Sequence, residues 1–149
     1  MLYFAYGSNM DPRQMARRCP GARSLGAARL AGHRLPFTWD SVRWGGGVGH
    51  CEPAAGDECW GVLWELTDEH VTSLDAYEQV ADGVYRQAMV VVEHQGRIVE
   101  ALIYLSNDDR WKRPSRRYVR ALVRGARVHG IPAPYVRGIR RARRAGPAG

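Results

Sequence analysis

Four residues near the start of the chain, Tyr6-Gly7-Ser8-Asn9, have the composition of a loop that binds an anion. They lie between an aromatic run at residues 2–6 and Asp11-Pro12, which is a strong helix start. Glycine and small polar residues at such a place point several backbone N–H groups outward, which suits a carboxylate or a developing oxyanion. The simpler alternative is a tight turn capped by Ser8 or Asn9. A serine nucleophile is disfavoured because the G-x-S-x-G elbow is absent.

Glu78 is the candidate proton-transfer residue, because it directly follows a predicted helix over residues 68–77. The negative end of that helix dipole, and partial burial behind Tyr77 and Val80, would both raise the pKa of the carboxyl group. A raised pKa brings a glutamate into the range of a general base at neutral pH. The alternative is a solvated surface acid, which composition alone favours.

The other residues that could carry chemistry do not have the spacing of a known site. The run Gly45–Gly49 lacks the Gly-Lys-Ser/Thr of a P-loop, and His50 stands where a dinucleotide fingerprint requires glycine, so a flexible turn is predicted there. The five histidines are scattered along the chain, and no metal site is predicted. Cys19, Cys51 and Cys59 show no C-x-x-C spacing, which argues against a disulfide scaffold or a zinc ribbon.

The elements that must position these residues follow from hydrophobic periodicity and turn residues. Strands are predicted at residues 2–6, 59–66, 85–93 and 97–105, and at 34–39, where Pro36 confines the strand to an edge or a bulge. Helices are predicted at residues 11–19, 68–77 and 115–129, with a helical turn over 134–140. No linker or repeat divides the chain, so we expect one domain over residues 1–142 and a flexible basic tail over 143–149.

Charge is distributed unevenly along the 149 residues, whose formal net charge is +7. Residues 1–109 hold all 15 acidic residues and nine basic ones, whereas residues 110–149 hold 13 basic residues and no acidic one. Any binding of nucleic acid would therefore concern the last 40 residues, where an amphipathic helix with a solvated arginine face is the commoner explanation. The chain shows no signal peptide or apolar run long enough to span a membrane, so a cytoplasmic protein is expected.

Several segments of the chain form an ordered pattern. They are residues 3–10, 28–30, 34–37, 56–64, Leu74-Asp75 with Glu78, residues 83–85, Tyr104 and residues 114–118. Taken together and in this order, they resemble the gamma-glutamylcyclotransferase family over most of the chain. One departure is Gln79, because family members often carry glycine after the catalytic glutamate.

The resemblance implies an α+β fold, a small mixed β-barrel flanked by helices. It implies Glu78 as the catalytic acid/base, with no metal. It also implies that Tyr85, Tyr104 and Tyr118, which composition alone would place in the core, line the substrate pocket. The γ-glutamyl group would be held by the N-terminal segment Tyr3, Phe4, Ala5, Tyr6, Gly7, Ser8 and Asn9.

The reaction implied by the resemblance is intramolecular. The substrate's α-amine attacks its own γ-carbonyl and releases 5-oxoproline and an amine or amino acid. This step requires no cofactor. The expected partner is thus a small γ-glutamyl molecule, with a homodimer left open and neither a membrane nor nucleic acid expected.

Two alternatives remain open at this stage. One is an enzyme dedicated to removing a γ-glutamyl blocking group from an intermediate of a natural-product pathway. The other is a binding protein on the same fold, without turnover, that engages a polyanion through Arg110 to Arg144.

Overall fold

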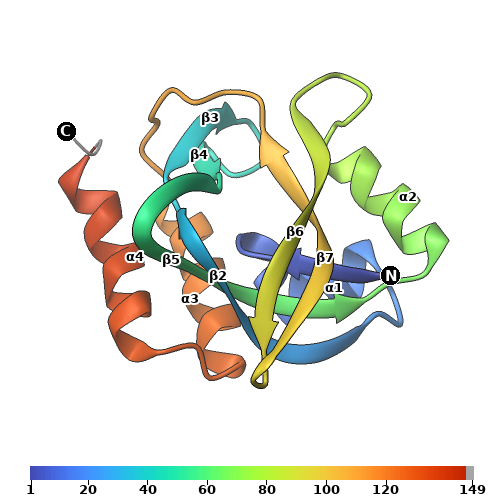
Figure 1. Ribbon diagram of the computed structural model, residues 1–149. Helices are drawn as coiled ribbons and strands as arrows, with labels where there is room; N and C mark the ends of the chain where they lie inside the picture. The colour runs from blue at the N-terminus through green and yellow to red at the C-terminus, as the bar shows by residue number, and fades with distance from the viewer. Residues whose placement is uncertain (147–149) are drawn as a thin grey trace.

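The computed structural model describes residues 1–146, in which five strands close into a barrel (Figure 1). Around the barrel the order is β1 (Leu2–Ala5), β5 (Glu52–Glu65), β2 (Arg23–Arg34), β6 (Tyr85–His94) and β7 (Arg97–Ser106). Four neighbouring pairs are antiparallel, and β1 closes the barrel by pairing in parallel with β7. The predicted mixed β-barrel flanked by helices is confirmed.

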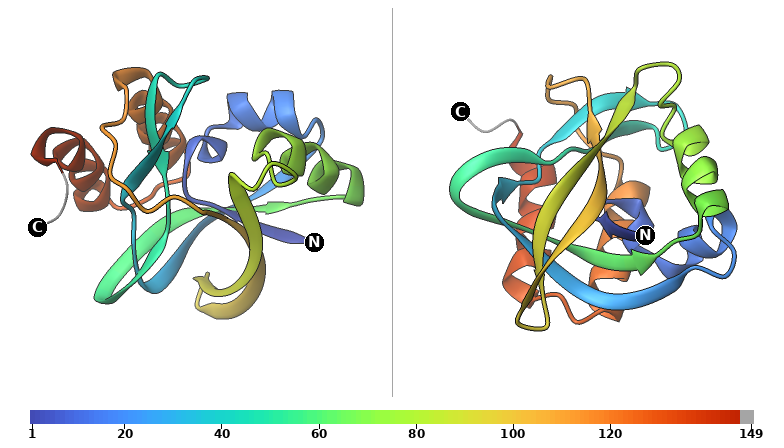
Figure 2. Two further views of the ribbon diagram at one scale, coloured as in Figure 1. Left: turned by 90° about the horizontal axis from the view of Figure 1, so that it is seen from above. Right: turned by 45° about the vertical axis from the view of Figure 1, so that its right-hand side comes forward.

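Helices cover two sides of the barrel (Figure 2). The short helix η1 (Ser8–Met10) and α1 (Pro12–Arg18) follow β1, α2 (Asp68–Tyr77) follows β5, and α3 (Arg116–Val128) and α4 (Ala133–Ala145) follow β7. Three of them begin with a capping side chain. Asp11, which the sequence indicated as a helix start, Thr67 and Ser115 each accept a hydrogen bond from a backbone N–H of the first turn.

A hairpin outside the barrel, formed by β3 (Phe37–Ser41) and β4 (Gly46–Gly49), corrects the prediction of a flexible turn at Gly45–Gly49. The glycines are explained by close packing. A Cβ atom added to Gly47 would lie 2.0 Å from the carbonyl oxygen of Lys112, and one added to Gly46 would lie 2.6 Å from that of Arg113. The hairpin therefore packs backbone against backbone on the segment that precedes α3, which composition alone could not show.

Two further elements differ from the prediction. Strand β2 was not predicted, because glycines interrupt its apolar pattern; Gly26 and Gly32 have positive φ and coincide with two shifts in its register with β5. Helix α4 is longer than the predicted turn and includes Arg143, Arg144 and Ala145, which were assigned to the tail. Residues 147–149 of that tail lie outside the described residues.

Buried apolar side chains form two clusters on opposite faces of the barrel wall. One cluster takes residues from all five barrel strands and fills the barrel interior; it includes Phe4, Leu30, Leu63, Val92 and Ile103. The other lies between the outer face of the barrel and the helices; it includes Tyr3, Ala5, Trp64, Leu102 and Leu122. Successive residues of a strand point to opposite faces, so Tyr3 and Phe4 of β1 belong to different clusters.

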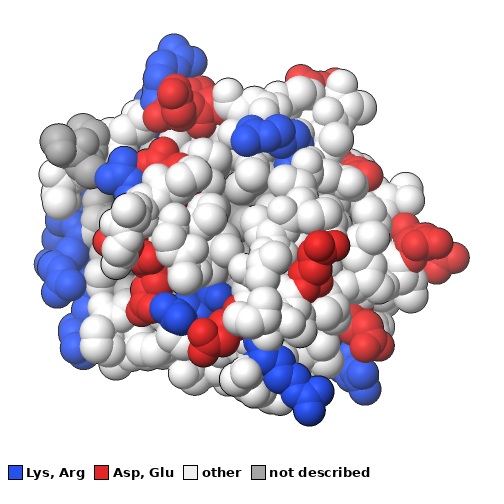
Figure 3. Space-filling view, viewed as in Figure 1, with Lys and Arg blue, Asp and Glu red and all other residues white. Residues whose placement is uncertain are grey.

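Charge on the surface follows the division seen in the sequence. Arginines on the barrel strands pair with carboxylates, as in Arg23–Glu65, Arg29–Glu58 and Arg34–Glu52. Basic side chains line the edge of the molecule on which α4 lies (Figure 3). Within residues 1–146, no helix has the length and apolar composition needed to cross a membrane.

Candidate active site

A cavity of about 370 Å³ lies outside the barrel, between strands β1, β6 and β7, the hairpin β3–β4 and the end of α2. It collects residues from distant parts of the sequence, from Tyr3 at the start to Tyr118 in α3. Most of the residues that the sequence analysis assigned to substrate or catalysis line it: Tyr3, Tyr6, Gly7, Ser8, Asn9, Glu78, Tyr85, Tyr104 and Tyr118.

Phe4 and Ala5 are the two predicted site residues that the structure does not bring to the cavity. Phe4 is fully buried in the barrel interior, because strand alternation turns it away from its neighbour Tyr3. Ala5 lies on the helix-covered face, where it is buried in the outer cluster and does not line the cavity. Both residues therefore support β1 rather than line the cavity.

Glu78 reaches the cavity from the C-terminus of α2. The helix ends in a Schellman turn, in which the N–H of Val80 donates to the carbonyl of Asp75 and the N–H of Gln79 donates to that of Ala76. Gln79 adopts a left-handed conformation, with φ of 52°, at the position where helices prefer glycine. The turn directs the next part of the chain away from the helix axis and leaves Glu78 facing the cavity.

The Glu78 carboxyl group is poised for proton transfer. Its burial raises the pKa to about 7, although the nearby guanidinium groups of Arg18 and Arg43 oppose the rise. Among residues 1–146, it forms no ion pair and accepts no hydrogen bond. A carboxyl group whose pKa lies near neutrality can both accept and return a proton at physiological pH.

Arg18 is a buried cation that sequence reasoning missed. Its guanidinium donates hydrogen bonds to Asn9 Oδ1 at 2.7 Å and to Ser8 Oγ at 3.3 Å, and burial lowers its pKa. None of the carboxylates in the described part of the chain forms an ion pair with it. The available signal was its position three residues after the buried Met15, on the apolar face of α1.

The hairpin contributes a second set of residues that the sequence analysis did not identify. Trp39, Arg43 and Trp44 all line the cavity. The Cζ atom of Arg43 lies 4.8 Å from the ring centre of Tyr77, and the Cζ atom of Arg18 lies at the same distance from that ring. The last residue of α2 thus holds two guanidinium groups beside Glu78.

The tyrosine hydroxyls have two kinds of role. The Tyr85 hydroxyl donates to the carbonyl of Gly49 at 2.8 Å, and that of Tyr104 donates to Asp75 Oδ1 at 2.6 Å, so both are occupied in holding the cavity wall. Tyr118 Oη instead accepts a hydrogen bond from the N–H of Gly49 at 2.7 Å. Its own proton is left for a ligand, and burial keeps its pKa far above the usual tyrosine range, so the hydroxyl is a donor.

Close packing explains the glycine in the Tyr6-Gly7-Ser8-Asn9 loop. A Cβ atom added to Gly7 would lie 2.9 Å from Tyr118 Oη. Any larger residue would therefore displace the hydroxyl that faces the cavity. In the described part of the chain, no three His, Cys, Asp or Glu side chains gather as a metal site.

Comparison with known proteins places this chain in a family. Residues 58–139 match the model of the AIG2-like family. The chain is 34% identical over 139 residues to the gamma-glutamylcyclotransferases of mouse and human, a match that covers 90% of this chain and 74% of each relative. The chain belongs to the gamma-glutamylcyclotransferase family.

The three-dimensional match extends over nearly the whole described fold. A solved structure of a gamma-glutamyl cyclotransferase superimposes with a TM-score of 0.90 at 32% identity, covering 94% of this chain and 86% of the other. The match includes the barrel and the helices on both of its sides, so the gamma-glutamylcyclotransferase fold expected from the resemblance is confirmed.

Proposed function

We propose that this member of the gamma-glutamylcyclotransferase family uses Glu78 to move protons while the α-amine of a γ-glutamyl substrate attacks its own γ-carbonyl carbon. The observation that carries this proposal is the cavity itself. It combines a carboxyl group of pKa about 7 with a buried arginine and a loop of small residues. These are the groups that cyclisation of an amino acid derivative needs.

Arg18 is suited to bind the α-carboxylate of the γ-glutamyl group. A guanidinium matches a carboxylate in charge and planar shape, and this one is fixed by Ser8 and Asn9. An anion bound there would also offset the cost of burying an unpaired cation. The constant γ-glutamyl part of the substrate would therefore lie beside the buried Arg18, next to the Tyr6-Gly7-Ser8-Asn9 loop.

Glu78 would then manage the protons. The substrate's α-ammonium gives one proton to the Glu78 carboxylate. The freed amine then attacks the γ-carbonyl carbon, forming a C–N bond and a tetrahedral oxyanion. Donors at Gly7, Ser8 or Tyr118, which line the cavity, would stabilise that oxyanion. The attacking nitrogen starts with three protons and keeps one in the ring, so it loses a second proton as the original amide C–N bond breaks. The leaving nitrogen gains these two protons and departs as an ammonium group.

Geometry accounts for much of the expected acceleration. Attack within one molecule replaces a bimolecular step, and a well-oriented intramolecular reaction can gain about 7 kcal/mol or more in its barrier. General acid/base catalysis by a positioned group adds a factor of about 10² to 10⁴. The cavity therefore has two tasks. It holds the substrate folded, with its amine near the γ-carbonyl carbon, and it provides Glu78 to transfer protons.

Product analysis tests this proposal. Incubation of the purified protein with γ-glutamyl amino acids should yield 5-oxoproline and the free amino acid, measured by liquid chromatography and mass spectrometry. An otherwise identical substrate with an acetylated α-amine should yield no product, because it has no nucleophile. Release of free glutamate, or equal turnover of the acetylated substrate, would contradict intramolecular attack.

A further inference from the structure

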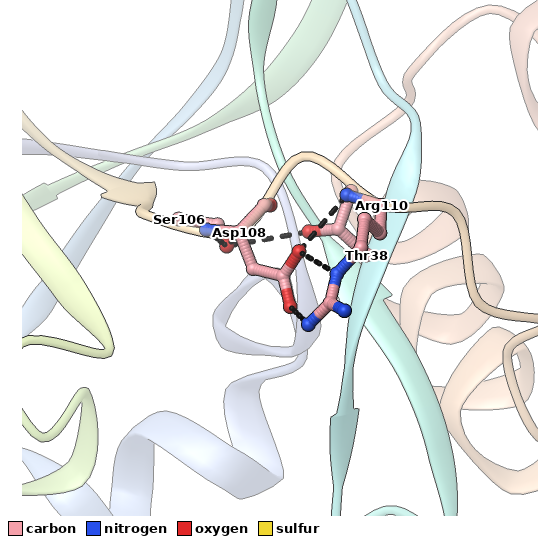
Figure 4. Close-up of polar contacts among 4 residues, drawn as sticks. All are labelled: Thr38, Ser106, Asp108 and Arg110. Atoms are coloured by element: carbon pink, nitrogen blue, oxygen red, sulfur yellow. Dashed lines mark hydrogen bonds and ion pairs between the residues drawn. The ribbon is translucent and has the colours of Figure 1, made fainter.

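The hairpin β3–β4 forms one wall of the cavity, to which it contributes Trp39, Arg43 and Trp44. It is fixed to the barrel at its base, where Thr38 Oγ1 donates to Ser106 Oγ at 3.3 Å (Figure 4). Ser106 in turn contacts the backbone of Asp108, whose carboxylate pairs with Arg110. Figure 2 shows the hairpin standing apart from the barrel strands, between the α1–α2 and α3–α4 pairs.

The backbone of the hairpin has an unusual conformation where it lines the cavity. Trp39 has a φ of 57°, a conformation that bulky side chains rarely adopt, at a bulge in the pairing of β3 with β4. Trp39, the residue at this bulge, forms part of the cavity wall. Strained residues of this kind persist where the surrounding structure holds them, and they gather at ligand sites.

The turn of the hairpin carries Arg43, an exposed residue that lines the cavity. Its neighbour Val42 is 97% exposed, so the turn faces solvent. The guanidinium of Arg43 is held on the Tyr77 ring, and the backbone carbonyl of Arg43 accepts a hydrogen bond from Arg117. Like Arg18, Arg43 forms no ion pair with any carboxylate of residues 1–146.

The charges in the cavity do not balance without a ligand. Its ionisable carboxyl and guanidinium groups are Glu78, Arg18 and Arg43, which sum to +1 when Glu78 is ionised. A γ-glutamyl amine has no net charge, because its α-ammonium cancels its α-carboxylate. A γ-glutamyl compound whose leaving group also carries a carboxylate has a net charge of −1 and neutralises the cavity.

We propose that Arg43 binds a carboxylate on the leaving group and so sets a preference for γ-glutamyl compounds whose released amine carries a carboxylate. This inference rests on the proposed cyclotransferase reaction. Arg18, buried and fixed by hydrogen bonds, takes the carboxylate that every substrate has, whereas Arg43, on an exposed turn, meets the part that varies. Arg43 is thus a specificity-determining residue outside the barrel.

A matched pair of substrates tests this assignment. γ-Glutamyl-alanine and γ-glutamyl-alaninamide differ only in the leaving group's carboxylate, and 5-oxoproline release gives kcat/KM for each. We expect the wild-type protein to favour the acid by about ten- to a hundredfold, the range of one charge-assisted hydrogen-bonded contact. In Arg43→Met the ratio of the two kcat/KM values should fall to about one, mainly through KM for the acid, and Arg43→Lys should keep part of the preference.

The control is Arg23→Met, which removes an exposed arginine that pairs with Glu65 on the barrel. It should keep the wild-type ratio. If Arg43→Met lowers both kcat/KM values by the same factor, Arg43 only holds the hairpin and the inference is overturned. If the wild-type protein turns over both substrates equally, the inference fails while the proposed function stands. If neither substrate yields 5-oxoproline, the proposed function itself fails.

Discussion

At the scale of single residues, the central feature is the Glu78 carboxyl group, whose pKa is raised by burial and lowered by nearby cations. Burial alone disfavours the charged form of Glu78, whereas Arg18 and Arg43 favour it. Burial has the larger effect, but the arginines limit the pKa to about 7. A more deeply buried glutamate without cations would stay protonated, and an exposed one would stay ionised; neither would exchange protons readily at neutral pH.

The raised pKa predicts a pH-dependent cost to stability. The folded protein holds the Glu78 proton more tightly than the unfolded chain. Ionisation of Glu78 therefore lowers the free energy of unfolding little below about pH 4.5 and by its full amount above about pH 7. A shift of this size corresponds to about 3 kcal/mol at most. Glu78→Gln removes the charge, so we expect it to raise the free energy of unfolding at pH 8.

Urea denaturation of both proteins at pH 4 and pH 8 measures this effect. At pH 4 the two free energies of unfolding should agree closely, because Glu78 is then neutral in the folded and the unfolded state. A difference that is the same at both pH values would show that the substitution acts through packing and not through the ionisation of Glu78.

At the scale of elements, the end of α2 and the hairpin are the two features that set the geometry of the cavity. The Schellman turn fixes the position of Glu78, and the glycines of β4 let the hairpin lie against the segment before α3. The resemblance drew attention to the end of α2, because it identified Glu78 there and noted Gln79 where family members often carry glycine. The second was missed, since a glycine that allows close backbone packing cannot be distinguished by sequence from one that makes a flexible turn.

Gln79 carries a conformational cost that glycine would remove. Its left-handed φ of 52° costs a residue with a side chain about 1 kcal/mol relative to glycine. We therefore expect Gln79→Gly to raise the free energy of unfolding by about that amount. Gln14→Gly, inside α1, should lower it by a similar amount, because glycine weakens a helix interior. A loss of stability in Gln79→Gly would contradict the turn described here.

Gly47 tests the packing of the hairpin. A methyl group there would overlap the carbonyl oxygen of Lys112, so Gly47→Ala should cost about 1–3 kcal/mol of stability and lower 5-oxoproline release by displacing Trp39 and Arg43. Gly138→Ala is the matched control, because a Cβ atom in that part of α4 meets no atom within 4 Å. It should stabilise the protein by up to about 1 kcal/mol. Equal thermal denaturation midpoints in the two variants would refute the close contact.

At the scale of the whole molecule, the net charge says little about the site. The cavity takes all but one of its lining residues from the acidic part of the chain, and Tyr118 is the contribution of the basic segment. Most predicted site residues come from β1, from the loop after it and from tyrosines on later elements. The sequence did not indicate Arg18 and Arg43, because each is one of 22 basic residues and becomes distinctive only when the fold places it beside Tyr77 and Glu78.

The most direct test of the account is the initial rate of 5-oxoproline release by wild-type protein and by Glu78→Gln, with a γ-glutamyl amino acid that the wild-type protein turns over. Circular dichroism should first show that both proteins are folded. We predict that the variant loses a factor of about 10² to 10⁴ in kcat, the contribution typical of general acid/base catalysis. Release at the wild-type rate by folded Glu78→Gln would contradict the central claim that Glu78 transfers the protons.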